Sequence, residues 1–164
     1  MNIDWVEILA FFFRAMQNGW INDDHTPWIM PPGGVLKGFK AFVFTEGPLI
    51  LMDQWSKSSK SGKSAGQTVI WHHETPIWIM QFGGLYPKEV IPFLKNVLRT
   101  TYEAKIFFGG RGPAQTQRSE EGLVYINSLE PGSNFERFSG IEQIINADPW
   151  RELGYHKYQG MSLV

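Results

Sequence analysis

The glycine-rich stretch FFGGRGP, residues 107–113, holds the side chain best suited to chemistry in this sequence. Its three glycines permit backbone conformations that other residues avoid, and Arg111 stands among them. The planar guanidinium of arginine matches carboxylate and phosphate groups. Arg111 is therefore predicted either to bind an anionic ligand or to pair with an internal carboxylate and so fix this loop. The candidate partners for such a pair are Glu120, Glu121 and Glu142.

Acid–base chemistry would need further groups beside Arg111. His73, Asp53 and Glu142 have side chains of the right type, and an enzyme acting on a small anionic substrate could use one of them together with Arg111. They are scattered along the chain, and the sequence alone does not bring them together. The chain has neither the G-x-S-x-G turn of serine hydrolases nor a cysteine nucleophile. The catalytic residues, if there are any, are therefore unknown from the sequence.

The stretch WSKSSKSGKSAG, residues 55–66, contains a Gly-Lys-Ser triplet and raises the question of a phosphate-binding loop. Such a loop needs a glycine five positions before the triplet, where this chain has Lys57. It also needs a following helix whose N-terminus faces the phosphates, whereas QTVIWHH has the composition of a strand. We therefore predict a solvated connection between two strands of a hairpin. A loose lysine patch for an acidic partner is the alternative.

Two short clusters contain side chains of types that bind metals. His72 and His73 are adjacent, and neighbours in a strand face opposite sides, so we do not expect them to share a metal ion. Residues 22–27, NDDHTP, could offer oxygen ligands to a divalent cation, but turns rich in Asp and Asn are commonly structural. No metal site and no cofactor are predicted.

The composition describes a folded protein with a large core. The chain has 164 residues, of which 43% are hydrophobic and 19% charged, and its formal net charge of −1 argues against direct binding of nucleic acid. It has no cysteine, which excludes disulfides and thiolate sites. The apolar run at residues 8–13 is too short to span a membrane, and Asp4 and Glu7 precede it where a signal peptide would be basic. A cytoplasmic protein without membrane contact is expected.

The same order of elements recurs in residues 1–84 and 85–164. Each half begins with a helical pattern, over residues 4–17 and 87–102, and continues with four strand patterns separated by turns. Four glycine pairs keep a spacing of about 75 residues: Gly34 and Gly110, Gly47 and Gly122, Gly66 and Gly140, Gly83 and Gly160. These patterns predict an α+β single domain with a tandem αββββ duplication of pseudo-twofold symmetry. Its one antiparallel sheet would have about eight strands, with helices on one face. A single domain without duplication is the alternative.

Both faces of the predicted sheet carry apolar side chains. An antiparallel sheet with one face in water should alternate more cleanly between apolar and polar residues than PLILMDQW and IWIMQF do. The second face is therefore expected to be covered by a subunit partner, by residues 28–34 or by a ligand. This predicts a homodimer or an aromatic-lined groove for a small molecule. The predicted ligand-binding residues are Arg111, Trp78, Trp71, His73, Asp53 and Glu142.

Several motifs, taken in order, resemble those of an uncharacterised bacterial family recorded as a domain of unknown function. The best markers are PIW at residues 76–78, RGP at 111–113 and FSGIE at 138–142. Members occur alone or C-terminal to a helix-turn-helix of the phage-repressor type. The resemblance implies no known reaction, and it suggests effector-sensing modules attached to DNA-binding domains. The chain departs from the family pattern at residues 64–68, where SAGQT replaces a Phe-x-Gly-x-Glu-like element.

Three classes of function are open on this basis. The favoured one is a non-catalytic ligand-binding or sensing module that acts as a homodimer. The second is an enzyme acting on a small anionic substrate through Arg111. The third is a protein-interaction or inhibitor module that presents its sheet face, as tandem α–β4 repeats do in the β-lactamase-inhibitor fold; that analogy is one of architecture, with no shared motif.

Overall fold

A computed structural model describes residues 3–24, 28–29, 38–114 and 116–164 of the chain. Two α-helices, α1 (Trp5–Asn18) and α2 (Ile91–Ala104), accompany nine strands, and a short 3₁₀ turn (Lys88–Val90) leads into α2. The strands of the first half are β1 (Trp28–Ile29), β2 (Phe39–Glu46), β3 (Leu49–Lys57), β4 (Lys63–His72) and β5 (Thr75–Leu85). Those of the second half are β6 (Gln117–Arg118), β7 (Leu123–Leu129), β8 (Arg137–Ala147) and β9 (Trp150–Ser162).

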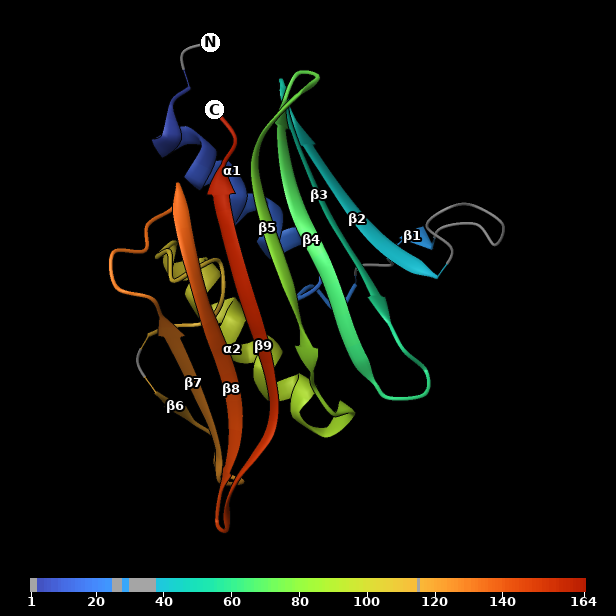
Figure 1. Cartoon of the computed structure of the whole chain (residues 1–164), viewed down its shortest axis with the longest axis vertical. Coiled ribbons are helices and arrows are strands. Elements are labelled where there is room, and N and C mark those ends of the chain that lie inside the picture. The colour runs from blue at the N-terminus through green and yellow to red at the C-terminus, as the bar shows by residue number, and fades with distance from the viewer. Residues whose placement is uncertain (1–2, 25–27, 30–37, 115) are drawn as a thin grey trace.

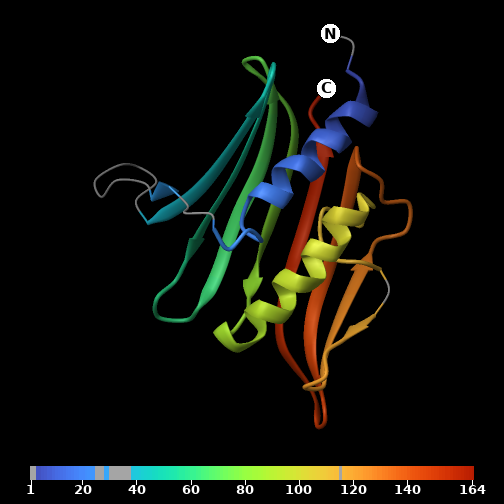
Figure 2. The same cartoon turned by 180° about the vertical axis from the view of Figure 1, so that it is seen from behind.

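All nine strands form one antiparallel sheet in the order β1-β2-β3-β4-β5-β9-β8-β7-β6. Figure 1 views this sheet from its open face, and Figure 2 shows from behind that both helices lie over the other face. The α+β class and the helices on one face are confirmed. The count exceeds the predicted eight strands because β1 adds a two-residue strand beside β2.

The first residues of each helix are of types that stabilise or tolerate a helix N-terminus. The Asp4 carboxylate caps α1 by accepting hydrogen bonds from the backbone amides of Val6 and Glu7, at 3.0 and 3.3 Å. Pro92 lies in the first turn of α2, where a missing amide hydrogen costs no hydrogen bond. The predicted helical pattern over residues 87–102 therefore begins its α-helix four residues later than expected, after a 3₁₀ turn.

Aromatic side chains fill the space between the helices and the sheet. Trp78 of β5 is fully buried and stacks on Phe135 and Phe138, with ring centroids 5.0 and 5.6 Å apart. Phe12 of α1 packs on Trp78 at 5.5 Å, so the first helix is held against the middle of the sheet. The aromatic excess of the sequence is thus largely a core feature.

The Lys/Ser stretch connects two strands, as the sequence predicted. Residues 58–62 join β3 to β4, and Gly62 has a φ of 72° that suits glycine. A strand, not a helix, begins within the Gly-Lys-Ser triplet, at Lys63. No helix N-terminus is therefore available there to receive a phosphate.

The order of strands is symmetrical about the β5–β9 pair, because β2 to β5 on one side match β6 to β9 on the other. A register shift at Ile70/Trp71 on β4 has its counterpart at Ile144/Ile145 on β8. Both shifts follow a glycine that faces an aromatic ring across the strands, with Gly66 opposite Phe82 and Gly140 opposite Tyr158. These features are what a tandem duplication would produce, and the duplication itself stays a prediction.

The open face carries an apolar row beside a row of glutamines. Five apolar residues are neighbours in register across β2, β3, β4, β5 and β9: Val43, Met52, Val69, Ile79 and Met161. The adjacent row contains Gln54, Gln67, Gln81 and Gln159. The second face is therefore mixed, not uniformly apolar. β1 extends the sheet edge beside β2, and residues 30–34, also named as a possible cover, lie outside the described residues.

We predict that Gly66→Ala destabilises the fold and that Gly83→Ala, one strand away, does not. A Cβ at Gly66 would lie 2.1 Å from the Gln54 carbonyl oxygen and 2.9 Å from Cα of Trp55, both backbone atoms. At Gly83 the nearest atom would be Cβ of Ala65 at 3.3 Å. Overpacking of this kind costs about 1–3 kcal/mol. Urea unfolding followed by circular dichroism measures both variants, and equal midpoints would contradict the close approach at Gly66.

Candidate functional site

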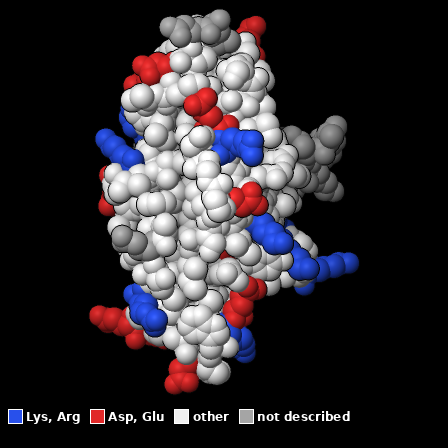
Figure 3. Space-filling model, turned by 60° about the vertical axis from the view of Figure 1, so that its left-hand side comes forward, with Lys and Arg blue, Asp and Glu red and all other residues white. Residues whose placement is uncertain are grey.

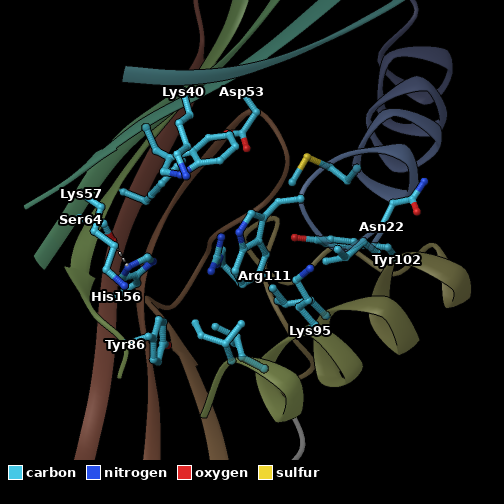
Figure 4. Close-up of a pocket in the computed structure, with 18 of the residues that line it drawn as sticks. Asn22, Lys40, Asp53, Lys57, Ser64, Tyr86, Lys95, Tyr102, Arg111 and His156 are labelled. Atoms are coloured by element: carbon cyan, nitrogen blue, oxygen red, sulfur yellow. Dashed lines mark hydrogen bonds between the residues drawn. The ribbon is translucent and has the colours of Figure 1, made fainter. Parts of the chain in front are cut away.

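A cavity of about 380 Å³ lies between the two helices and the first-half strands. Its aromatic walls come from Trp20, Trp55, Phe82, Tyr86 and Tyr102. Its cationic side chains are Lys40, Lys57, Lys95 and Arg111. Figure 4 shows Arg111 between the sheet-side residues Lys57, Ser64 and His156 and the helix-side residues Lys95 and Tyr102. The cavity thus combines apolar walls with several inward-facing charges, an arrangement typical of small-molecule sites.

Arg111 pairs with Glu142, one of the three partners named from the sequence. Its Nε donates to Oε1 of Glu142 at 2.8 Å, and its Nη2 donates to the same oxygen. The other carboxylate oxygen accepts from the Tyr125 hydroxyl at 2.6 Å. Glu142 is fully buried and Arg111 is 7% exposed. Burial alone would lower the pKa of Arg111, but the charge and hydrogen bond of Glu142, together with the smaller effects of Tyr102 and Tyr125, hold that pKa well above its ordinary value.

The glycine-rich loop is held in place by hydrogen bonds from the sheet. Nδ2 of Asn127 donates to the carbonyl oxygens of Phe108 and Gly112, at 3.1 and 2.7 Å. Gly109 and Gly110 have φ values of 67° and 69°, which other residues rarely adopt. The conformation that glycine permits therefore carries Arg111 back over the sheet toward Glu142.

The guanidinium of Arg111 keeps one nitrogen for a ligand. Both bonds to Glu142 use Nε and Nη2, and within the described residues Nη1 donates to no acceptor. The guanidinium carbon lies 5.8 Å from the centre of the Phe82 ring, so the group stacks against a cavity wall. The two alternatives for Arg111, internal pairing and anion binding, are therefore compatible in this geometry.

Asp53 faces the same cavity from β3. It is 7% exposed, and its Oδ1 accepts a hydrogen bond from the Thr68 hydroxyl at 2.8 Å. Burial raises the pKa of Asp53 to about 6, against the weaker opposing effects of Thr68 and Arg111. Asp53 therefore changes charge just below neutral pH.

His156 of β9 lies between Ser64 and Glu142. Its Nε2 is 3.2 Å from the Ser64 hydroxyl, and its Nδ1 is 3.8 Å from Oε1 of Glu142. Its ring packs on Tyr86, with centroids 4.8 Å apart. Burial, together with the positive charge of Arg111, lowers the pKa of His156 to about 4, so the imidazole is neutral at pH 7.

The structure brings together only part of the predicted ligand-binding set. Arg111 and Asp53 line the cavity, and Glu142 lies beneath Arg111. Trp78 is a core residue whose indole nitrogen donates to the Phe135 carbonyl at 2.7 Å. Trp71 lies on the opposite face of the sheet from Ser64, and His73 is exposed in the turn between β4 and β5.

Several cavity residues were not predicted, among them His156, Tyr86 and the lysines. They come from five separate segments that the fold alone brings together. One signal was present for His156, because alternation along GYHKYQG places it on the same face as Tyr158 and Gly160. The other members of the site have no local pattern that would single them out.

The two clusters of metal-binding residue types have other arrangements. Asp23 pairs with Lys95 at 2.7 Å and with Arg99 at 3.5 Å, while His25 lies outside the described residues. The rings of His72 and His73 are only 4.7 Å apart, because His73 has left the strand with a φ of 54°. The expectation that they face opposite sides is wrong for this reason. No group of three or more potential ligands gathers in the part of the chain that the structure describes.

The surface charge and the lengths of the helices describe the rest of the molecule. On the side drawn in Figure 3, acidic and basic side chains are scattered among a larger area of uncharged ones. Within the described residues, neither of the 14-residue helices has the length and apolar character needed to cross a membrane.

The fold and the site define an α+β protein that holds a cation-bearing cavity between its helices and its sheet. The chain belongs to the family described as Domain of unknown function (DUF5680), whose model matches residues 60–159. No curated protein and no solved structure matches the chain. The expected family is thus confirmed as one of unknown function, and its bacterial origin and its association with helix-turn-helix domains stay expectations.

We predict that Asp53→Asn increases stability above about pH 6 and has little effect below about pH 4. The pKa of Asp53 is raised from 3.8 to about 6 in the folded protein, so folding favours the protonated acid. Wild-type stability therefore falls as the pH rises through this window, by on the order of 2–3 kcal/mol. Asparagine lacks this ionisation and can still accept the Thr68 hydrogen bond.

Urea unfolding at a series of pH values measures the difference between Asp53→Asn and the wild type. Asp24→Asn is the matched control, because Asp24 is exposed and has no side-chain partner among the described residues. The free energies of unfolding of Asp53→Asn and the wild type are compared at each pH. If their difference stays constant from about pH 4 to about pH 8, Asp53 ionises as an ordinary carboxyl group and the prediction is wrong.

Proposed function

We propose that this protein binds a small anionic molecule with an apolar or aromatic body in the cavity between its helices and its sheet. The observation that carries the proposal is the charge of the lining. Among the described residues, four cationic side chains face the cavity, together with two carboxylates, Asp23 and Asp53. The ordinary consequence of such a lining is attraction of an anion.

The positive charge is not cancelled within the site. Lys95 is neutralised by Asp23, and Arg111 by Glu142. Lys40 and Lys57 have no ion-pair partner within the described residues. Asp53, with its raised pKa, opposes them only weakly near pH 6. Lys40 and Lys57 are therefore the groups that give the cavity its preference for anions.

The aromatic side chains that line the cavity suit a ligand with a planar or apolar part. Trp55 and Phe82 line the sheet side of the cavity, and Trp20 lies on the helix side with the Lys95 ammonium 5.3 Å from its ring. A volume of about 380 Å³ is within the usual range for small-molecule pockets. An aromatic carboxylate is the simplest molecule that satisfies both the walls and the charges.

The wider role follows from the family resemblance and is part of the proposal. A cytoplasmic sensing module that responds to such an anion would suit a domain whose relatives are expected beside DNA-binding domains. An enzyme that acts on the bound anion would use the same cavity and the same Arg111. The cavity geometry favours both of these over an inhibitor module that acts through the sheet face alone.

We predict that benzoate raises the melting temperature of the protein and that benzamide, its neutral analogue, does not. Lys40→Gln weakens the benzoate effect because it removes one uncompensated charge, with a loss in affinity of about 3- to 10-fold for a partly exposed pair. Differential scanning fluorimetry and isothermal titration calorimetry measure both effects.

Lys60→Gln is the control for Lys40→Gln, since Lys60 lies in the loop between β3 and β4 and does not line the cavity. Equal responses to benzoate and benzamide would contradict a site selective for anions. A benzoate response that Lys40→Gln and Lys60→Gln leave equally strong would place the anion elsewhere.

We also propose that the protein is a homodimer formed through the open sheet face. The apolar row described above runs across five strands, and its end residues Val43 and Met161 are each 52% exposed. Val69, at the centre of the row, is only 5% exposed, so the exposed apolar surface lies toward the two ends. Exposed apolar side chains on a sheet face are a common mark of protein interfaces. Two copies related by a twofold axis would bury the row against itself.

We predict that the wild-type protein sediments as a dimer and that Val43→Glu sediments as a monomer. A carboxylate at Val43 would be desolvated without a partner in the interface. Val6→Glu is the matched control, because Val6 is 80% exposed on α1, on the other side of the sheet. A wild-type protein that stays monomeric at high micromolar concentration would overturn the dimer.

A further inference from the structure

One row of residues crosses the cavity side of the sheet over four adjacent strands, β4, β5, β9 and β8. Ser64 on β4 is the register partner of Gly84 on β5, Gly84 is the partner of His156 on β9, and His156 is the partner of Glu142 on β8. Register partners point to the same face. Ser64, His156 and Glu142 are therefore aligned by the strand pairing itself.

Gly84 allows Ser64 and His156 to meet across an intervening strand. A Cβ at Gly84 would lie 2.7 Å from Cδ2 of His156, too close for any side chain. With glycine there, Nε2 of His156 reaches the Ser64 hydroxyl at 3.2 Å. The half-buried Ser64 lines the cavity, so this contact faces the space where a ligand would lie.

The remaining nitrogen of His156 faces Glu142. Nδ1 is 3.8 Å from Oε1 of Glu142, and it is buried without a hydrogen-bond partner in the described part of the chain. A buried polar atom without a partner is unfavourable in a purely structural residue. Catalytic hydrogen bonds are often long before a substrate binds. A small movement of the imidazole would bring Nδ1 within hydrogen-bonding distance of the Glu142 carboxylate.

We propose that Ser64, His156 and Glu142 form a nucleophile, a base and an orienting carboxylate for acyl transfer from a small ester bound in the cavity. The hydroxyl on Nε2 and the carboxylate 3.8 Å from Nδ1 stand in the same order as the groups of a serine hydrolase triad. The proposal rests on the proposed function in one respect, because the ester must enter the same cavity.

The reaction balances with water as the only co-reactant. The Ser64 oxygen attacks the ester carbonyl carbon while its proton passes to Nε2 of His156, and a tetrahedral oxyanion forms. The bond from carbon to the leaving oxygen then breaks, and His156 returns the proton to the departing alcohol. Water then attacks the acyl-serine carbonyl carbon while its proton passes to His156. The bond from that carbon to the Ser64 oxygen breaks, His156 returns the proton to Ser64, and the acid is released.

Lys57 is placed to stabilise the oxyanion. It is the register partner of Ser64 on β3, lines the cavity, and is labelled beside Ser64 in Figure 4. A cation beside the reacting carbonyl supplies the stabilisation that backbone amides supply in many hydrolases. Glu142 acts through His156 as a positioning residue, and its pair with Arg111 fixes its own orientation.

The test uses the full chain with p-nitrophenyl acetate, with p-nitrophenyl hemisuccinate, an anionic ester, and with a fluorophosphonate probe. We expect hydrolysis of the esters, and we expect the probe to form a bond to Ser64 with loss of fluoride, located by peptide mass spectrometry. Ser64→Ala and His156→Gln each lower kcat/KM by about 10²- to 10⁴-fold. The control Ser59→Ala, an exposed serine in the same β3–β4 connection, keeps the wild-type rate.

Thermal unfolding of Ser64→Ala and His156→Gln establishes that a lost rate is not a lost fold. The proposal is overturned if wild-type turnover does not exceed that of Ser64→Ala, or if the probe labels another residue. Benzoate binding without ester hydrolysis or labelling would overturn the triad and leave the binding proposal standing. Labelling of Ser64 in a protein that does not distinguish benzoate from benzamide would overturn the proposal of anion binding and leave the triad standing.

Discussion

The buried ion pair between Arg111 and Glu142 is the constraint on which the site depends. It joins the loop that follows α2 to the centre of β8, with both partners almost completely removed from water. Loss of one partner from such a pair costs about 3–5 kcal/mol, since the other charge is left buried alone. The surrounding groups satisfy it: Tyr125 donates to the second carboxylate oxygen, and Asn127 fixes the loop that carries the arginine. The pair thus fixes the position of Arg111 in the lining of the cavity.

Residues from both halves of the chain form the site. Lys40, Asp53 and Ser64 come from first-half strands, whereas Arg111, Glu142 and His156 come from the second half. They meet because β5 and β9 pair at the middle of the sheet and because both helices lie over one face. Small residues at the crossing points, such as Gly84 and Gly66, let larger side chains from neighbouring strands approach each other. A site of this kind requires strands from both halves of the chain.

The parts of the fold that the sequence predicted are those with a local physical cause. The first helix, the turns between the strands and the strand that begins at the Gly-Lys-Ser triplet follow from short-range backbone chemistry, and each is present. The pairing of Arg111 with one of three glutamates was one of the two alternatives predicted, because the planar guanidinium matches a carboxylate group. The ring contact between His72 and His73 was not, since it depends on a left-handed residue in a turn that alternation along a strand does not describe.

The sequence by itself determined the α+β class, the order of the main elements and the family. Of the six ligand-binding residues it predicted, two, Arg111 and Asp53, line the cavity. Only the tertiary structure decided that Trp78 is a core residue and that Trp71 faces away from the cavity. It also aligned Ser64, His156 and Glu142. The reason is that alternation assigns residues to a face within one strand, whereas contacts between side chains depend on the register between strands far apart in the chain. That register follows from the packing of the whole sheet against its helices.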